Sequence, residues 1–97
     1  MDADIYEGQI GFAYVVGKRF REAVLVLTKF FKAYPGTVGM RPLLVVSYVE
    51  LGMMEQARTQ AAEILRQSPQ FSLETEALKA APPSDAFIAD LRKAGLK

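Results

Sequence analysis

Apolar residues recur along this chain at intervals of three and four positions, which is the spacing of one face of an α-helix. No stretch keeps the strict alternation of apolar and polar positions that marks a half-buried strand. Pro35-Gly36, Gly52 and Pro69 divide the pattern into segments, because proline and glycine favour helix ends. The pattern predicts an all-α protein whose helices lie at about 3–16, 20–33, 38–51, 54–67, 73–80 and 85–94.

Two of these predicted helices have informative ends. Pro42 is compatible with the helix at about 38–51 because it falls in the first turn, where a missing N–H costs little. Gly95 suits the left-handed residue that follows a helix, and Leu96 would then fold back onto Leu91 as in a Schellman motif. The last helix is therefore predicted to cap the carboxy-terminal end of the domain.

Two segments of the chain follow nearly the same pattern, YVVGKRFREAVLVLTKFFKAYP at 14–35 and YVELGMMEQARTQAAEILRQSP at 48–69. Tyrosine, alanine and proline recur between them at a fixed interval of 34 residues, with no insertion. This period resembles the tetratricopeptide repeat, which consists of two antiparallel helices. The residues that carry the resemblance are Gly11, Tyr14, Ala23 and Pro35 in the first unit and Tyr48, Gly52, Ala57 and Pro69 in the second.

The resemblance implies a single tetratricopeptide-like α-solenoid domain over residues 1–97. Its expected parts are one repeat at about 4–37, a second at about 38–71, and two capping helices at about 72–97. The match has departures, since Glu7 and Arg41 stand where a large apolar residue is usual and Val45 replaces the small Gly11. Gly17 also falls one place earlier than the equivalent of Gly52. These departures leave the packing of the first helix of each unit open.

A narrower resemblance covers about residues 38–97, where QSPQFSLE and the terminal LRKAGL are the most specific pieces. This stretch is similar to the carboxy-terminal end of tetratricopeptide regions attached to bacterial class III adenylate/guanylate cyclases or transcriptional regulators. The resemblance implies a regulatory or scaffolding appendage that binds another protein. The competing hypothesis is a structural domain that forms homodimers and has no foreign ligand.

Composition excludes several other classes of function. The chain has no cysteine and no histidine, so thiolate chemistry and the commonest general base and metal ligand are missing. A net charge of +1 gives no argument for nucleic acid, and the basic cluster Lys18, Arg19 and Arg21 lies beside Glu22 in a predicted solvated turn. The longest apolar stretch, at 42–49, is too short to cross a membrane, so a cytoplasmic protein is expected.

No catalytic constellation is found in the sequence. Glu74 and Glu76 are two positions apart, so they do not face each other on a helix. Asp85 and Asp90 are interpreted as a helix-start charge and a surface charge. We therefore expect no enzymatic activity of this chain, no cofactor and no metal.

A partner groove is the main candidate site. By the resemblance, it is lined by the first helix of each unit, at Ile5, Phe12, Val15, Val16, Val46, Val49 and Glu50. These mainly apolar positions predict that the partner is an apolar helix or peptide. The alternative is that this surface is core, covered by a carboxy-terminal helix through Phe87, Ile88 and Leu91, and both hold if that helix acts as a plug.

A second candidate surface lies on the helix at 20–33, which is apolar nearly all round and is therefore expected to be covered nearly all round. Leu25 and Val26 correspond to Thr59 and Gln60 in the second unit, which look solvated. The asymmetry predicts self-association through Leu25 and Val26. The alternative is ordinary variation, with both side chains partly exposed and no partner.

Overall fold

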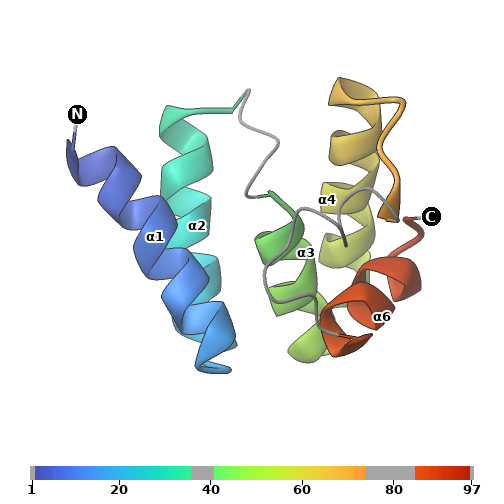
Figure 1. Ribbon diagram of the computed structural model, residues 1–97, viewed down its shortest axis with the longest axis horizontal. Coiled ribbons are helices and arrows are strands. Elements are labelled where there is room, and N and C mark those ends of the chain that lie inside the picture. The colour runs from blue at the N-terminus through green and yellow to red at the C-terminus, as the bar shows by residue number, and fades with distance from the viewer. Residues whose placement is uncertain (1, 36–40, 74–84, 97) are drawn as a thin grey trace.

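The computed structural model describes residues 2–35, 41–73 and 85–96, with no account of the side chains of residues 2–8 and 85. The described residues form helices and no strand, which confirms the all-α prediction (Figure 1). The predicted helix at about 73–80 falls almost entirely outside the described residues. The helices are α1 (Asp2–Val16), α2 (Phe20–Ala33), α3 (Arg41–Glu50), α4 (Met54–Gln67) and α6 (Asp85–Lys93).

The helices form two hairpins with α6 packed against the second (Figure 1). In the first hairpin α1 packs against α2, and in the second α3 packs against α4. Helix α3 also packs against α1, α2 and α6, so it is the central element of the described fold. That position explains why every residue from Arg41 to Ser47 is buried.

The turns inside the two hairpins have the same backbone geometry. In the first turn the Arg19 N–H donates to the Tyr14 carbonyl at 2.7 Å, and in the second the Met53 N–H donates to the Tyr48 carbonyl at 2.8 Å. A second hydrogen bond completes a Schellman motif in each turn. The Lys18 N–H donates to the Val15 carbonyl, and the Gly52 N–H donates to the Val49 carbonyl, both at 3.0 Å. The 34-residue period seen in the sequence is therefore present in the backbone as well.

The left-handed residue of each turn differs between the two hairpins. Gly52 has φ of 76° in the second turn, and its equivalent in the first turn is Lys18, with φ of 62°. Gly17 is thus one position too early to take the left-handed conformation, which a side chain adopts at a cost. The cost is partly offset because the Arg19 guanidinium lies over the Tyr14 ring, 5.3 Å from its centroid.

Helix α6 ends in a third Schellman motif, as predicted. Gly95 has φ of 104°, and the Leu96 N–H donates to the Leu91 carbonyl at 3.2 Å. Leu91 and Leu96 are both fully buried, which is the apolar contact that usually accompanies this turn.

Small residues set the spacing of the helices in each hairpin. Ala23 of α2 and Ala57 of α4 are fully buried at equivalent positions. Gly11 of α1 lies against Leu27 of α2, so close that a Cβ on Gly11 would come within 2.5 Å of Leu27 Cδ2. The first hairpin is therefore closely packed at this crossing because position 11 has no side chain.

Candidate interaction surfaces

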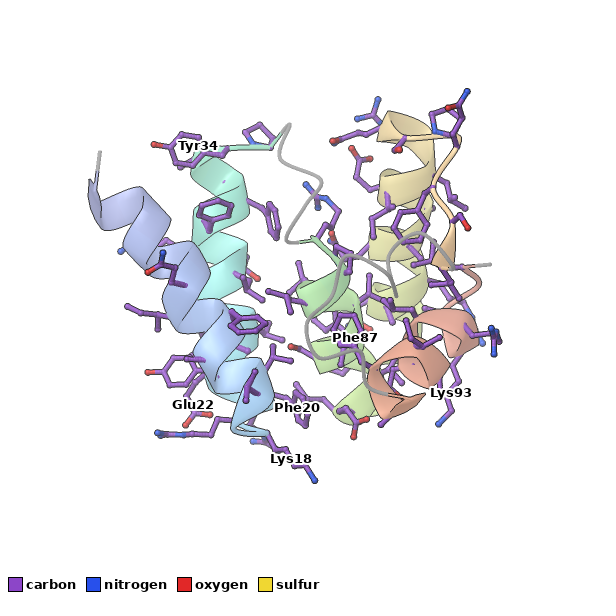
Figure 2. All side chains as sticks on the ribbon, viewed as in Figure 1. Lys18, Phe20, Glu22, Tyr34, Phe87 and Lys93 are labelled. Atoms are coloured by element: carbon purple, nitrogen blue, oxygen red, sulfur yellow. The ribbon has the colours of Figure 1, made fainter. Side chains whose placement is uncertain are left out.

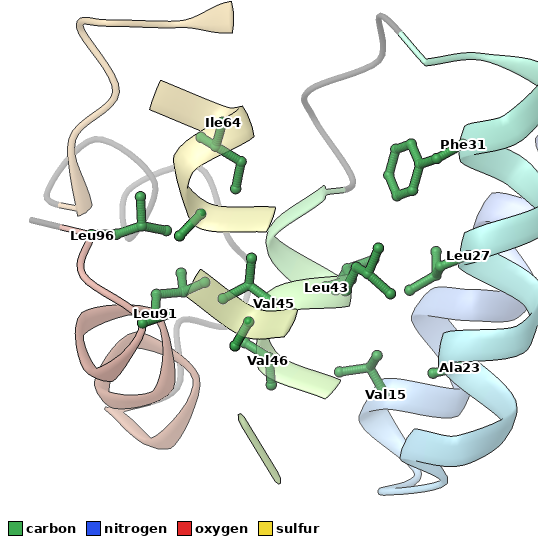
Figure 3. Packing of buried hydrophobic residues seen from close by; sticks show 14 of the residues in the cluster. Val15, Ala23, Leu27, Phe31, Leu43, Val45, Val46, Ile64, Leu91 and Leu96 are labelled. Atoms are coloured by element: carbon green, nitrogen blue, oxygen red, sulfur yellow. The ribbon is translucent and has the colours of Figure 1, made fainter. Parts of the chain in front are cut away.

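The exposed apolar residues of α1 form the first candidate surface. Phe12 is 49% exposed and Val16 is 66% exposed, and their spacing of four places them on one helix face. We call Phe12 and Val16 the α1 surface. Val15, also predicted to line the groove, is instead buried in the core, where Figure 3 places it near Val46 of α3. Ile5 lies in α1, but its side chain is outside the described part.

The α3 side of the predicted groove is covered within the chain. Val46 is 3% exposed, Val49 is partly buried and Glu50 is exposed. Helix α6 packs on α3, and Figure 3 shows Leu91 of α6 directed toward Val45 of α3. Val46 is therefore buried within the chain, while the α1 surface is exposed.

The period of 34 residues makes the two halves of the groove directly comparable. Phe12 is equivalent to Val46, and Ile10 is equivalent to Leu44. Val46 and Leu44 are buried, whereas Phe12 and Ile10 are exposed. The same structural positions are thus covered in the second hairpin and uncovered in the first.

A second exposed apolar position lies on α2. Leu25 is 72% exposed and Val26 is partly buried, and we call these two residues the α2 surface. The equivalent positions on α4 hold exposed Thr59 and partly buried Gln60. Both α2 and α4 bury the opposite face, which includes Ala23 and Leu27 on α2, so Leu25 contributes nothing to the core.

Arg41 is a buried charged residue whose role the sequence did not reveal. Its side chain is 6% exposed, and its Cζ lies 4.3 Å from the centroid of the Phe31 ring. Its Nη2 donates to the Pro35 carbonyl at 3.1 Å and its Nη1 donates to the Gln60 amide oxygen, while Gln67 also donates to Pro35 at 3.0 Å. Arg41 thus joins α2, α3 and α4, and burial lowers the pKa of its guanidinium.

Asp90 was interpreted from the sequence as a surface charge, and the structure corrects this. The side chain is 4% exposed because α6 turns it toward α3, beside Leu91 and the core. Burial, and after it the nearby Glu50, raise the pKa of Asp90 to about 7, while the charge of Lys93 acts in the opposite direction. The five-residue spacing of Asp85 and Asp90 gave no sign of this burial, because the burial depends on the packing of α6 against the rest of the fold.

Within the basic cluster at the first turn, Arg19 is both ion-paired and stacked on an aromatic ring. Arg19 donates through Nε and Nη2 to one carboxylate oxygen of Glu22, at 3.0 and 2.7 Å. The backbone hydrogen bond of Glu22 and then Arg19 hold the pKa of that carboxyl below its usual range. Lys18 and Glu22 both lie at the α1–α2 turn (Figure 2), so this cluster serves the turn.

One shallow hollow lies on the outside of the second hairpin. It has a volume of about 310 Å³ and is lined by Tyr48, Glu55, Gln56, Thr59 and Gln60. The Thr59 hydroxyl donates to the Glu55 backbone carbonyl at 3.1 Å, which is a contact within α4. The hollow is therefore a depression between Tyr48 of α3 and the first half of α4.

Comparisons of the chain with protein-family models, with curated proteins and with solved structures gave no match. Within the described ranges, no helix has the length and apolar character needed to cross a membrane. The described residues also contain no group of three or more acidic side chains arranged to hold a metal ion. The equivalence of the two hairpins therefore rests on the repetition within the chain itself.

Proposed function

We propose that this chain is a tetratricopeptide-like interaction module that binds an apolar helix or extended segment of another protein through the α1 surface. The observation that carries the proposal is the difference between Phe12 and Val46. These residues are equivalent in the repeat, yet the chain covers Val46 and leaves half of Phe12 in water. Phe12 lies one helical turn from exposed Val16, and contiguous exposed apolar surface often marks an interface.

The narrower resemblance supports a regulatory role for such binding. Residues 38–97 are similar to tetratricopeptide regions that accompany bacterial cyclases and transcriptional regulators, as judged from QSPQFSLE and LRKAGL. In this proposal the module docks a partner on a rigid helical surface and makes or breaks no covalent bond.

A selection from a displayed library of amphipathic helical peptides tests the proposal. Peptides that bind the chain are expected to lose at least tenfold in affinity when Phe12→Asp is introduced. The matched control is Thr59→Asp, at an exposed position of α4, which should leave binding unchanged. Circular dichroism would verify that both variants are folded. Peptides that bind the Phe12→Asp variant as tightly as the parent would contradict the proposal.

Homodimerisation is the second candidate function, and the 72% exposure of Leu25 favours it. Light scattering over a hundredfold dilution tests this directly. A dimer that dissociates in Leu25→Glu, but persists in the equivalent control Thr59→Glu, would support self-association through the α2 surface. A monomer at every concentration would exclude it.

A further inference from the structure

Helix α1 lies at the edge of the described fold, where it packs on α2 and, less extensively, on α3 (Figure 1). Gly11 and Val15 are buried on that side of the helix. On the solvent side, Gln9, Phe12 and Val16 are exposed and follow one another at intervals of three and four residues. Alternating intervals of three and four are those of the seam along which two helices pair in a coiled coil. Together with Gln9, the α1 surface therefore has the spacing of a helix-pairing seam.

The seam extends toward the amino end of α1 by helical register. Ile5 continues the same spacing, since it is four residues before Gln9. No charged residue occurs from residue 8 to residue 17, so the centre of the seam has no ionic group that a helix pair would bury. The occupant that fits this surface is therefore a helix with an equally uncharged stripe, and α1 of a second copy is such a helix.

The two ends of α1 carry opposite charge. Asp2 and Asp4 are in its first turn by sequence, whereas Lys18 and Arg21 are exposed just beyond its carboxy end. When a second copy of α1 lies antiparallel, the acidic end of each helix meets the basic end of the other. Antiparallel helices also place each N-terminus beside a C-terminus, where their partial charges attract. A parallel copy would bring like charges together at both ends.

We propose that the α1 surface is the two-fold interface of a homodimer, in which α1 pairs antiparallel with α1 of a second copy. Ile5 of one copy lies opposite Val16 of the other, and Gln9 of one copy lies opposite Phe12 of the other. The symmetry axis passes between residues 10 and 11, so each contact occurs twice, as in any isologous dimer.

This dimer rests on the proposed function in that it uses the same surface. A second copy and a foreign helix cannot both occupy Phe12, so the partner binds only after the dimer dissociates. The concentration of the chain itself thereby regulates the binding proposed above. Leu25 of the α2 surface lies outside this interface.

Disulfide trapping tests both the interface and its direction, because the chain contains no cysteine of its own. With a rise of about 1.5 Å per residue, the two copies of position 9 are about 5 Å apart along the helix axes. Gln9→Cys is therefore expected to form a disulfide-linked dimer on mild oxidation. The control Thr59→Cys, at an exposed position of α4, should remain monomeric under the same conditions.

The ends of the seam report the direction of pairing. The two copies of position 16 are about 17 Å apart in the antiparallel arrangement, and so are the two copies of position 5. Ile5→Cys alone and Val16→Cys alone should therefore form no disulfide, whereas a mixture of the two chains should form a linked heterodimer. Linked dimers in each chain alone would show a parallel pair and refute the proposal. Absence of a linked product in both Gln9→Cys and the mixture would refute it as well.

Sedimentation equilibrium of chains without cysteine provides an independent measurement. Phe12→Asp should weaken the dimer at least about tenfold, because it removes a large apolar group from the centre of the seam. The matched control Leu25→Glu, at an exposed apolar position of α2, should leave the dimer unchanged. A dimer weakened by Leu25→Glu and not by Phe12→Asp would refute the α1 interface. The disulfide pattern remains decisive if Phe12→Asp disturbs folding.

This proposal and the proposed function can fail separately. Helical peptides that bind through Phe12 to a chain that gives no trapped dimer would remove the dimer and leave the proposed function intact. A trapped dimer without any peptide that binds would do the reverse. Where both hold, the oxidised Gln9→Cys dimer should bind those peptides at least about tenfold more weakly than the same chain after reduction. Equal binding by the two forms would refute occupation of the α1 surface by a second copy.

Discussion

Gly11 lies against Leu27 so closely that a Cβ on Gly11 would come within 2.5 Å of the leucine Cδ2. The equivalent positions in the second hairpin are Val45 and Ala61, both buried. The larger residue of the pair is thus Leu27, on α2, in the first hairpin and Val45, on α3, in the second hairpin. Each hairpin combines one small and one large residue, in opposite order.

The first prediction is that Gly11 and Leu27 can be substituted without a large loss of stability only when both are changed together. Gly11→Val alone should destabilise the fold by about 1–3 kcal/mol through overpacking. Leu27→Ala alone should cost about 2–5 kcal/mol through a cavity. The double variant recreates the combination found at Val45 and Ala61, so its cost should be well below the sum. Urea unfolding of the four chains in a double-mutant cycle measures the coupling, and strict additivity would contradict the prediction.

The second prediction concerns the left-handed residue of the first turn. Lys18→Gly should raise the free energy of unfolding by about 0.5–1 kcal/mol, because φ of 62° is costly for a side chain. Gly52→Ala should lower it by a similar amount, since φ there is 76°. Thermal unfolding of the two variants checks both signs. Gly17→Ala is the neighbouring control and should not reproduce the effect of Lys18→Gly.

The third prediction separates the shape of Arg41 from its charge. Arg41→Lys keeps the charge but loses the planar contact with Phe31 and the paired donors, so it should cost about 1–3 kcal/mol. Arg41→Met keeps most of the apolar volume and needs no buried cation, so it should cost less. Gln67 still donates to the Pro35 carbonyl in either variant. A methionine variant less stable than the lysine variant in urea unfolding would show that the charge dominates.

The fourth prediction is a fall in global stability as the pH rises. The folded chain keeps the Asp90 proton up to about pH 7, whereas an unfolded aspartate loses it near pH 4. Between these values the folded state binds more protons, so the free energy of unfolding decreases with pH. From pH 5.5 to 8 the decrease should be on the order of 2 kcal/mol, and Asp90→Asn should abolish it. A parent chain equally stable at both pH values would contradict the expectation.

Acidic conditions should act in the opposite direction through Glu63. Hydrogen bonds from Arg66 and then Gln67 lower the pKa of Glu63 to about 2. Any stability that Glu63 contributes is present above its unfolded pKa and is lost as the pH falls through the folded value. An NMR titration should place the Glu63 midpoint well below 4 in the parent chain and closer to 4 in Arg66→Gln. An unchanged midpoint in the variant would show that Arg66 is not the cause.

The sequence was sufficient for the helices with clear end signals. Helices α2 and α4 have the predicted bounds, because the glycine turns and prolines on either side are local features. The Schellman turn at Gly95 was predicted for the same reason. Lys18 was not expected in a left-handed conformation, since Gly17 next to it is the residue that ordinarily takes that role.

The candidate surfaces depended on packing between distant segments, which the sequence did not determine. Helical periodicity identified Val46 and Phe12 as apolar positions of similar kind, but it gave no reason for Val46 to be buried and Phe12 to be exposed. Asp90 was misread because a charged residue on a short amphipathic helix is ordinarily exposed, whereas this side chain is 4% exposed. Arg41 departed from the repeat pattern, which was a signal, although its stacking on Phe31 was not predictable from that departure.

The opposite order of the small and large residues also limits which helices can form a hairpin with each other. A hairpin formed between α1 of one unit and α4 of the other would place Gly11 opposite Ala61 and leave a void. One formed between α3 and α2 would press Val45 against Leu27. The helices of one hairpin are thus poor substitutes for those of the other, which discourages hairpins formed from helices of different repeats during synthesis and refolding.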